Sequence, residues 1–146
     1  KTMAITSAVC NSFKQEILEA EHNFTASSGN TFNLALYDSD ATLNKSTTVY
    51  TTSEELATTG GYTAKGNALT SVTPVLDSDT AVCDFSNSSW TSASFTARGC
   101  LIFNDSHSSD AAVCAIEFGG DKTVTSGTFT IEFPAASAGT AIIGIA

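Results

Sequence analysis

The first long pattern in the chain has the spacing of a helix. Val9, Phe13, Ile17 and Ala20 follow one another at steps of four, four and three residues, while charged and amide side chains occupy the positions between them. Thr6 or Ser7 can cap the start. The pattern predicts one amphipathic helix over about residues 6–22. It leaves open whether the apolar stripe covers one end of a sheet or packs on a neighbouring subunit.

Beyond residue 30 the period changes to two, which is typical of strands with one wet face. In "TFNLALY" the apolar side chains of Phe32, Leu34 and Leu36 alternate with other residues. The sequence predicts strands at residues 31–37, 80–85, 92–103, 111–118, 127–134 and 140–146, and another that ends near Leu76, where Pro74 indicates a sheet edge. Polar connectors such as "SNSSWT" and "GGDKTVTS" separate the later strands.

The region between residues 38 and 68 is less regular. "TTVYTT" is a short β-prone piece, and "SEELATTGG" can form one helical turn before its glycines. With about seven or eight strands and no helix between the later ones, the chain is predicted to be mainly β. We expect a single domain over residues 1–146, an antiparallel β-sandwich or jelly-roll-like fold with one N-terminal helix.

One stretch breaks the alternation. In "ARGCLIFNDS" four apolar residues, Cys100–Phe103, follow Gly99 without interruption. Such a run is typical of a central strand buried on both faces, or of a strand whose second face contacts something else. Gly99 suits a bulge or a close approach of another backbone. "NDSHSSD" then predicts a hairpin into the next strand.

Charge narrows the classes of partner. The net charge is −9, although only 14% of the 146 residues are charged. An acidic chain repels phosphate backbones, so we expect no nucleic-acid partner, whereas a protein with basic patches would suit it. No apolar run is long enough to span a bilayer, and no block of signal-peptide length follows the N-terminus, so neither a membrane partner nor a secretion signal is expected.

Cysteines and histidines suggest little chemistry. The four cysteines (Cys10, Cys83, Cys100 and Cys114) form no C-x-x-C pair, which excludes the common zinc ribbons and fingers. Apolar neighbours favour free, buried thiols. His22 and His107 lie at the polar end of the predicted helix and in a hairpin loop, where solvated side chains are expected.

The motifs of hydrolases and phosphate-binding loops, G-x-S-x-G and a glycine-rich loop ending in Lys-Ser/Thr, are absent from the sequence. Asp38/Asp40 and Asp77/Asp79 present oxygens two residues apart, as calcium loops do, but turn chemistry explains them more simply. We therefore assign no catalytic, cofactor-binding or metal-ligating residue and expect no enzyme and no cofactor.

Trp90 and four glycosylation sequons are candidate surface sites. Trp90 is predicted in a polar connector, either folded back over the sandwich edge or exposed as an anchor for a subunit or a sugar. Four Asn-x-Ser/Thr sequons, at Asn23, Asn44, Asn87 and Asn104, are explained by the abundance of Ser and Thr.

Several segments occur in an order that resembles a family of small virion structural proteins of tailed, especially marine, bacteriophages. They are "MAITSAVCNSFKQEIL", "FNLALYDSDATL", "YTTSEE", "GGYTAKGNALTSVTP", "FTARGCLIFNDS", "FGGDKTVTSGTFTIEFP" and "AIIGIA". The resemblance spans nearly the whole chain and brings no catalytic residues with it.

The resemblance implies a capsid cement or decoration protein on the capsid exterior, assembled in the cytoplasm of the bacterial host. Such proteins bind the major capsid protein and form homo-oligomers, often trimers, so Cys100–Phe103 or Ile142–Ile145 are candidates for burial between protomers. The alternative is a tail or fibre-associated protein that contacts a receptor, with Trp90 in the contact.

Overall fold

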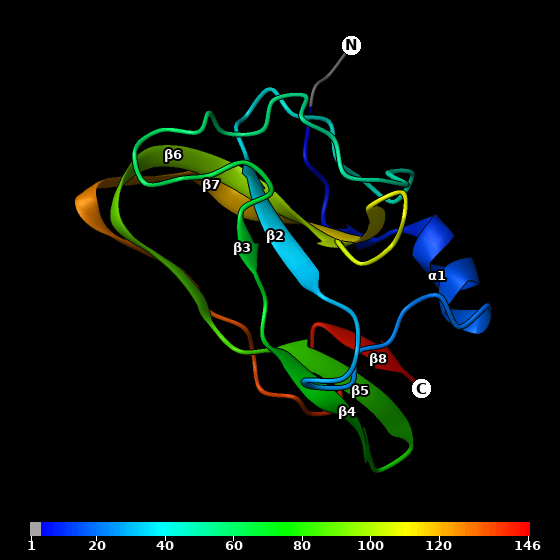
Figure 1. The fold of residues 1–146 in the computed structure, drawn as a ribbon. Coiled ribbons are helices and arrows are strands. Elements are labelled where there is room, and N and C mark those ends of the chain that lie inside the picture. Colours follow the sequence, from blue (N-terminus) through cyan, green and yellow to red (C-terminus); the bar gives the residue numbers. More distant parts are fainter. Residues whose placement is uncertain (1–3) are drawn as a thin grey trace.

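The computed structural model describes residues 4–146, so the first three residues of the predicted domain lie outside the described residues. Within this range the chain forms one short helix and eight strands (Figure 1). In chain order they are β1 (Ala8–Val9), α1 (Asn11–Leu18), β2 (Phe32–Tyr37), β3 (Asn67–Ala68), β4 (Ser71–Asp77), β5 (Thr80–Phe85), β6 (Ser88–Asn104), β7 (Ala111–Ile131) and β8 (Ile143–Ile145). None of the helical structure in this range is long and apolar enough to cross a membrane.

The strands form two sheets, which we call the large sheet (β1-β7-β6-β2-β3) and the small sheet (β4-β5-β8). Every strand ladder in them is antiparallel. In Figure 1 the small sheet lies below β2 and β3, and α1 lies to one side of both sheets. The predicted fold class is confirmed: the chain is mainly β, with an arrangement consistent with a β-sandwich.

The run Cys100–Phe103 lies in the middle of the large sheet. β6 pairs with β2 on one side and with β7 on the other, and all four side chains are fully buried. Burial contributes about 1.5–3 kcal/mol for each large apolar side chain. The prediction of a strand buried on both faces is confirmed. The same burial makes it wrong that Cys100–Phe103 could pack between protomers, because all four side chains are already covered within the chain.

Gly99 precedes this run for a steric reason. The β6–β7 register shifts between Ala97 and Gly99, which confirms the predicted bulge. A Cβ atom at Gly99 would lie 2.5 Å from the carbonyl oxygen of Ile116. Both alternatives considered for this glycine, a bulge and a close backbone approach, therefore hold.

The helix is shorter than predicted. It covers Asn11–Leu18 instead of residues 6–22, because Ala8 and Val9 pair with β7 as a short strand. The residue before the helix is Cys10, whose side chain makes no capping hydrogen bond, so neither Thr6 nor Ser7 caps it. The predicted stripe retains Phe13 and Ile17, which pack against the core.

Two predicted strands are one. The segment 111–118 and the first part of 127–134, up to Ile131, belong to a single strand, β7, because polar residues between them continue to pair with β6. Thr96 and Thr123 lie opposite each other there, with their hydroxyls 2.8 Å apart. We call this long pair of strands the β6–β7 ribbon. The predicted last strand is reduced to Ile143–Ile145.

Trp90 was predicted in a polar connector, which is wrong, and of the two alternatives for its ring the exposed anchor is excluded. The residue lies inside β6, opposite Phe129 of β7, and only 4% of it is exposed. Its ring packs edge-on against Phe95 and Phe129, at centroid distances of 6.4 and 6.0 Å. The ring belongs to the core and offers no exposed face to a sugar or a subunit.

The irregular region contains no regular strand or helix between residues 38 and 66, and "TTVYTT" contributes only a single bridge, Val49 to Ala111. A carboxylate holds it instead. Glu55 accepts hydrogen bonds from the hydroxyl of Tyr50, from the hydroxyl of Tyr62 at 2.7 Å and from the backbone N–H of Lys65 at 2.7 Å. We call these four residues the Glu55 cluster.

Lys65 extends this cluster to the β6–β7 hairpin. Its ammonium lies 2.8 Å from an oxygen of Asp105 and 2.9 Å from one of Asp110, above the rings of Tyr50 and Phe103. These hydrogen bonds to the two carboxylates raise the pKa of Lys65. The loop is thus fastened to the large sheet by side-chain contacts and by isolated bridges, and not by a regular strand.

The four cysteines are free and buried, as predicted. Burial raises the pKa of Cys10 and of Cys83 to about 11, and it raises the pKa values of Cys100 and Cys114 further above the usual range. All four thiols therefore act as small apolar side chains at neutral pH.

Candidate functional site

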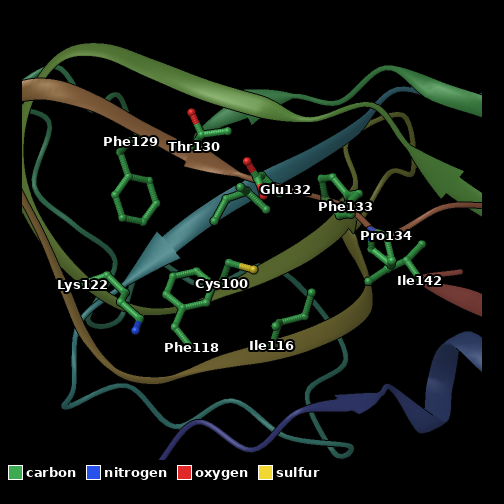
Figure 2. Close-up of a pocket in the computed structure, with 11 residues that line it drawn as sticks. Cys100, Ile116, Phe118, Lys122, Phe129, Thr130, Glu132, Phe133, Pro134 and Ile142 are labelled. Carbon is green, nitrogen blue, oxygen red and sulfur yellow. The ribbon is translucent and has the colours of Figure 1, made fainter. Parts of the chain in front are cut away.

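An apolar groove runs along the inner side of the β6–β7 ribbon (Figure 2). Its volume is about 470 Å³, which lies within the ~300–1,000 Å³ typical of ligand pockets. We call it the aromatic groove. It is lined by Cys100, Ile116, Phe118, Lys122, Phe129, Thr130, Ile131, Glu132, Phe133, Pro134 and Ile142.

A bend in β7 creates the groove. Gly119 and Gly120 have φ angles of 78° and 150°, which residues other than glycine rarely adopt. Phe118 comes just before the bend and Phe129 lies on the returning part of the strand, with ring centroids 6.3 Å apart. The strand folds its apolar side chains toward each other across the groove.

In "TFTIEF" (residues 128–133) apolar and polar residues alternate, which indicates one apolar face formed by Phe129, Ile131 and Phe133. These residues line the groove and are only half-buried, so the face is a concave surface at the edge of the core. Phe133 also packs edge-on against Phe85 of the small sheet, at 5.6 Å between centroids. The sequence pattern identified the face but not that part of it stays open.

The groove holds few groups that could make or break bonds. The Cys100 thiol points into it (Figure 2), but burial raises the pKa of this thiol so far that it stays protonated. The polar residues of the lining are Lys122, Thr130 and Glu132, all exposed. The arrangement suits contact with an apolar surface.

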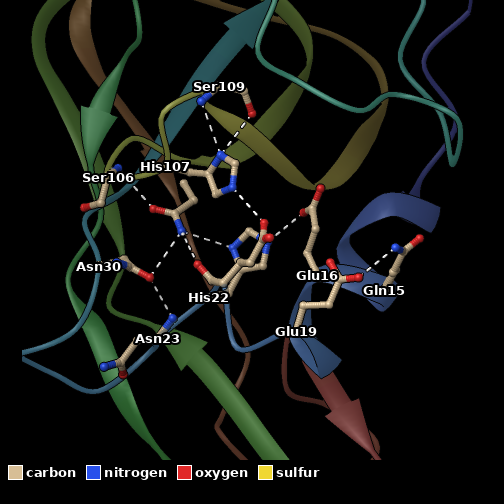
Figure 3. A network of polar contacts seen from close by, with 11 residues as sticks. Gln15, Glu16, Glu19, His22, Asn23, Asn30, Ser106, His107 and Ser109 are labelled. Atoms are coloured by element: carbon tan, nitrogen blue, oxygen red, sulfur yellow. Dashed lines mark hydrogen bonds and ion pairs between the residues drawn. The ribbon is translucent and has the colours of Figure 1, made fainter.

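A second concentration of polar side chains joins the end of α1 to the β6–β7 hairpin, and we call it the histidine network (Figure 3). His22 was predicted to be solvated, which is wrong: its side chain is fully buried. Its Nε2 lies 2.8 Å from an oxygen of Glu16, and its Nδ1 lies 3.1 Å from the amide nitrogen of Asn104. Since Asn104 donates to Nδ1, the His22 proton on Nε2 is donated to Glu16.

Packing against aromatic rings explains why the His22 side chain is buried. Its ring lies 4.9 Å from that of Phe13 and 6.3 Å from that of Phe32, measured between centroids. Asn104, at the end of β6, is itself fully buried, which also removes it as a glycan acceptor. Side chains six residues apart do not meet in a regular helix or strand, so no local pattern could have predicted the pair Glu16 and His22.

His107 brings a hydroxyl and a carboxylate together. Its Nε2 lies 2.8 Å from an oxygen of Glu21, and its Nδ1 lies 2.9 Å from the hydroxyl oxygen of Ser109. A serine, a histidine and a carboxylate also make a hydrolase triad, but there the serine faces Nε2 and the carboxylate faces Nδ1, so the two ring nitrogens are exchanged here. In addition, the backbone N–H of Ser109 donates to the same Nδ1, as in a local turn. Ser109 is exposed, and neither it nor His107 lines the aromatic groove.

The two halves of the network are adjacent, since the rings of His22 and His107 are stacked at 6.2 Å. Glu16 and Glu21, which pair with them, flank the end of the helix. The arrangement therefore ties the segment after α1 to the β6–β7 hairpin. This supports a structural role for the network.

Of the two aspartate pairs considered for calcium, only Asp38/Asp40 lies beside a further carboxylate among the described residues, that of Glu54. Carboxylate oxygens of Asp38, Asp40 and Glu54 lie within 4.8 Å of one another. Calcium takes 6–8 oxygen ligands, and three exposed carboxylates are a common surface feature without an ion. Asp77 instead accepts a hydrogen bond from the backbone N–H of Ala138 at 2.7 Å.

A smaller apolar cavity lies between α1 and the small sheet. Its volume is about 120 Å³, and we call it the anchor pocket. It is lined by Phe13, Ile17, Phe24, Pro74, Ala81, Val82, Cys83, Ile143 and Ile145, without a charged side chain among them. No sequence pattern predicted it, because its walls come from four segments that are distant along the chain.

Comparison with protein-family models, with curated protein sequences and with solved structures finds no match for this chain.

Proposed function

We propose that this chain is a structural protein of a bacteriophage particle, specifically a capsid cement or decoration protein that binds neighbouring major capsid subunits. Its role would be to stabilise the assembled shell by bridging subunits. The resemblance of the sequence to small virion proteins suggests this class, and the geometry of the apolar surfaces supports it.

One observation carries the proposal: a small domain has two distinct apolar surfaces. Phe85 lies between them, with its ring 5.6 Å from Phe133 of the aromatic groove and 6.1 Å from Phe24 of the anchor pocket. Ile142 lines the groove and the next residue, Ile143, lines the pocket. A protein that bridges two neighbours requires two such surfaces, and many weak bridges act together in a shell.

The charge distribution agrees with a protein partner that carries basic patches. Acidic residues exceed basic ones by nine in the full sequence. Complementary charge would orient each copy on the shell, while apolar burial would supply the binding free energy. Binding only to the assembled shell stabilises that state by mass action.

The alternative, a tail or fibre protein that contacts a receptor, combined an exposed Trp90 with the polar loops. Since that ring is buried in β6, the tryptophan part of this contact is missing from the described surface. The position on the particle is decided by imaging. Electron cryo-microscopy of the particle should place the chain on the outer capsid lattice, and density only at the tail would contradict the proposal.

A binding experiment tests the bridging role. Shells assembled from the major capsid protein alone are mixed with increasing amounts of the chain, and their disassembly temperature is followed by scanning fluorimetry. We expect that temperature to rise and to saturate at a fixed ratio of copies. Phe129→Ser, in the groove, should weaken the effect, whereas the neighbouring Thr128→Ser, at an exposed position, should not. A chain that neither cosediments with shells nor stabilises them would contradict the proposal.

A further inference from the structure

The small sheet presents an apolar row that its own chain leaves uncovered. Leu76 of β4 lies opposite Ala81 of β5, which lies opposite Ile145 of β8. Residues directly opposite in antiparallel strands share one face of the sheet. Leu76 is 74% exposed and Ile145 is 56% exposed. Three strands thus offer one continuous apolar line.

The next row of the same face is covered. Cys83 lies opposite Ile143, and these residues are only 8% and 6% exposed. Phe13 and Ile17 of α1 stand over them and enclose the anchor pocket. The face therefore continues from an open row into a pocket whose ~120 Å³ matches a single large apolar side chain. An exposed rim around a buried anchor is the arrangement that carries most of the free energy at protein interfaces.

The two edges of the small sheet differ. β4 carries Pro74 and a register shift between Val72 and Val75, both of which discourage pairing with another strand. β8, at the opposite edge, has the sequence Ile143-Gly144-Ile145, without a proline, a charge or a bulge. Its outer backbone groups are open to an added strand.

Charge determines what kind of strand fits. The β4–β5 hairpin carries Asp77 and Asp79 at its turn, and the three strands of the small sheet contain no lysine or arginine. Lys14 is the only basic residue on α1, which also carries Glu16. A second copy of this acidic chain would meet like charges at this face. Lysine or arginine beside an apolar segment would complement it.

We propose that the free edge of β8, the row Leu76–Ala81–Ile145 and the anchor pocket together bind an extended segment of a partner protein, with apolar residues at alternate positions and basic residues beside them. The segment adds a fourth strand to the small sheet and places one apolar side chain in the pocket. The identity of the partner as a capsid subunit rests on the proposed function. The chemistry of the bound segment follows from the surface alone.

A random library of twelve-residue peptides, displayed and selected on the purified chain, tests the surface without any virion. We expect the enriched peptides to alternate apolar residues and to contain lysine or arginine. Synthetic copies should bind at least tenfold more weakly to Leu76→Thr and to Ile145→Thr, because each change removes apolar contact while keeping a strand-forming residue. Added salt should weaken binding severalfold.

The control is Val49→Thr, which makes the same kind of change at an exposed apolar residue outside the small sheet. It should bind as the wild type does, and thermal unfolding should show that all three variants remain folded. Acidic peptides, peptides indifferent to Leu76→Thr and Ile145→Thr, or no enrichment would overturn the inference. So would a dimer of the chain that these two substitutions dissociate. Shell binding with no peptide selectivity would reject this surface while leaving the cement role intact.

Discussion

Glu55 offers a direct test of how the irregular region is held. Glu55→Ala removes the acceptor of three hydrogen bonds, from the hydroxyls of Tyr50 and Tyr62 and from the backbone N–H of Lys65. It shortens no regular strand or helix, because Glu55 lies in the loop between β2 and β3. Any loss of stability therefore measures the polar contacts themselves.

The magnitude follows from the burial of each donor. Tyr62 is only 2% exposed, so its hydroxyl would be left without an acceptor, at a cost of about 1–3 kcal/mol. The Lys65 N–H adds about 1 kcal/mol, and Tyr50, which is partly exposed, adds less because water can replace the carboxylate. We expect a total loss of about 3–4 kcal/mol. That is a large part of the ~5–15 kcal/mol that stabilises a typical domain.

Urea unfolding followed by tryptophan fluorescence measures this loss. Trp90 is the single tryptophan, and its ring lies 6.3 Å from that of Tyr62, so it reports on this region. Glu55→Gln keeps an acceptor oxygen and should lose about half as much. Glu54→Gln changes the exposed neighbouring carboxylate and should stay within about 0.5 kcal/mol of the wild type. A Glu55→Ala midpoint equal to that of the wild type would refute the reasoning.

Four further outcomes are expected. Leu101→Ala, in the fully buried run of β6, should cost about 2–5 kcal/mol in chemical denaturation, and a cost below about 1 kcal/mol would show that the run is not a central strand. Burial raises the pKa of Asp84, so the neutral form of its carboxyl group favours the folded state. The neutral carboxyl stabilises the fold below the pKa that Asp84 has in the unfolded chain, and this stabilisation is lost as pH rises through the folded pKa. Asp84→Asn should therefore be more stable than the wild type by about 1 kcal/mol at pH 7, with the difference shrinking as pH falls toward about 4, the ordinary pKa of an aspartate; a constant difference would contradict this. Burial raises the pKa values of the Cys10 and Cys83 thiols to about 11, so their protonated forms favour the fold. The free energy of unfolding should therefore fall as pH rises above about 9. In a Cys83→Ala variant this decrease should be smaller. A fluorophosphonate, which labels activated serines, should leave Ser109 unmodified, and labelling that disappears in Ser109→Ala would instead indicate a hydrolase.

Local patterns predicted the parts of the fold that burial alone decides. The unbroken run Cys100–Phe103 indicated a strand covered on both sides, and the alternation of Phe129, Ile131 and Phe133 identified the apolar face of the ribbon. Both follow from the period of two and need no knowledge of the partners. The free, buried thiols followed in the same way from their apolar neighbours.

Long-range pairing decided what those patterns missed. Polar residues between 119 and 126 look like a turn, yet they continue β7 because Lys122, Thr123 and Val124 find partners in β6. Ala8 and Val9 fit a helical stripe but gain backbone partners in β7 instead. His22 looked solvated because Asn104, its buried partner, is 82 residues away. The aromatic groove depends on a bend in β7, and its volume is a property of the folded ribbon alone.

We propose that this chain coats a phage shell in many copies by adhesion. Quantitative mass spectrometry of purified particles, which compares its copy number with that of the major shell protein, tests this most directly. We expect copies in a fixed proportion close to that of the shell protein. A handful of copies per particle, or none, would contradict it.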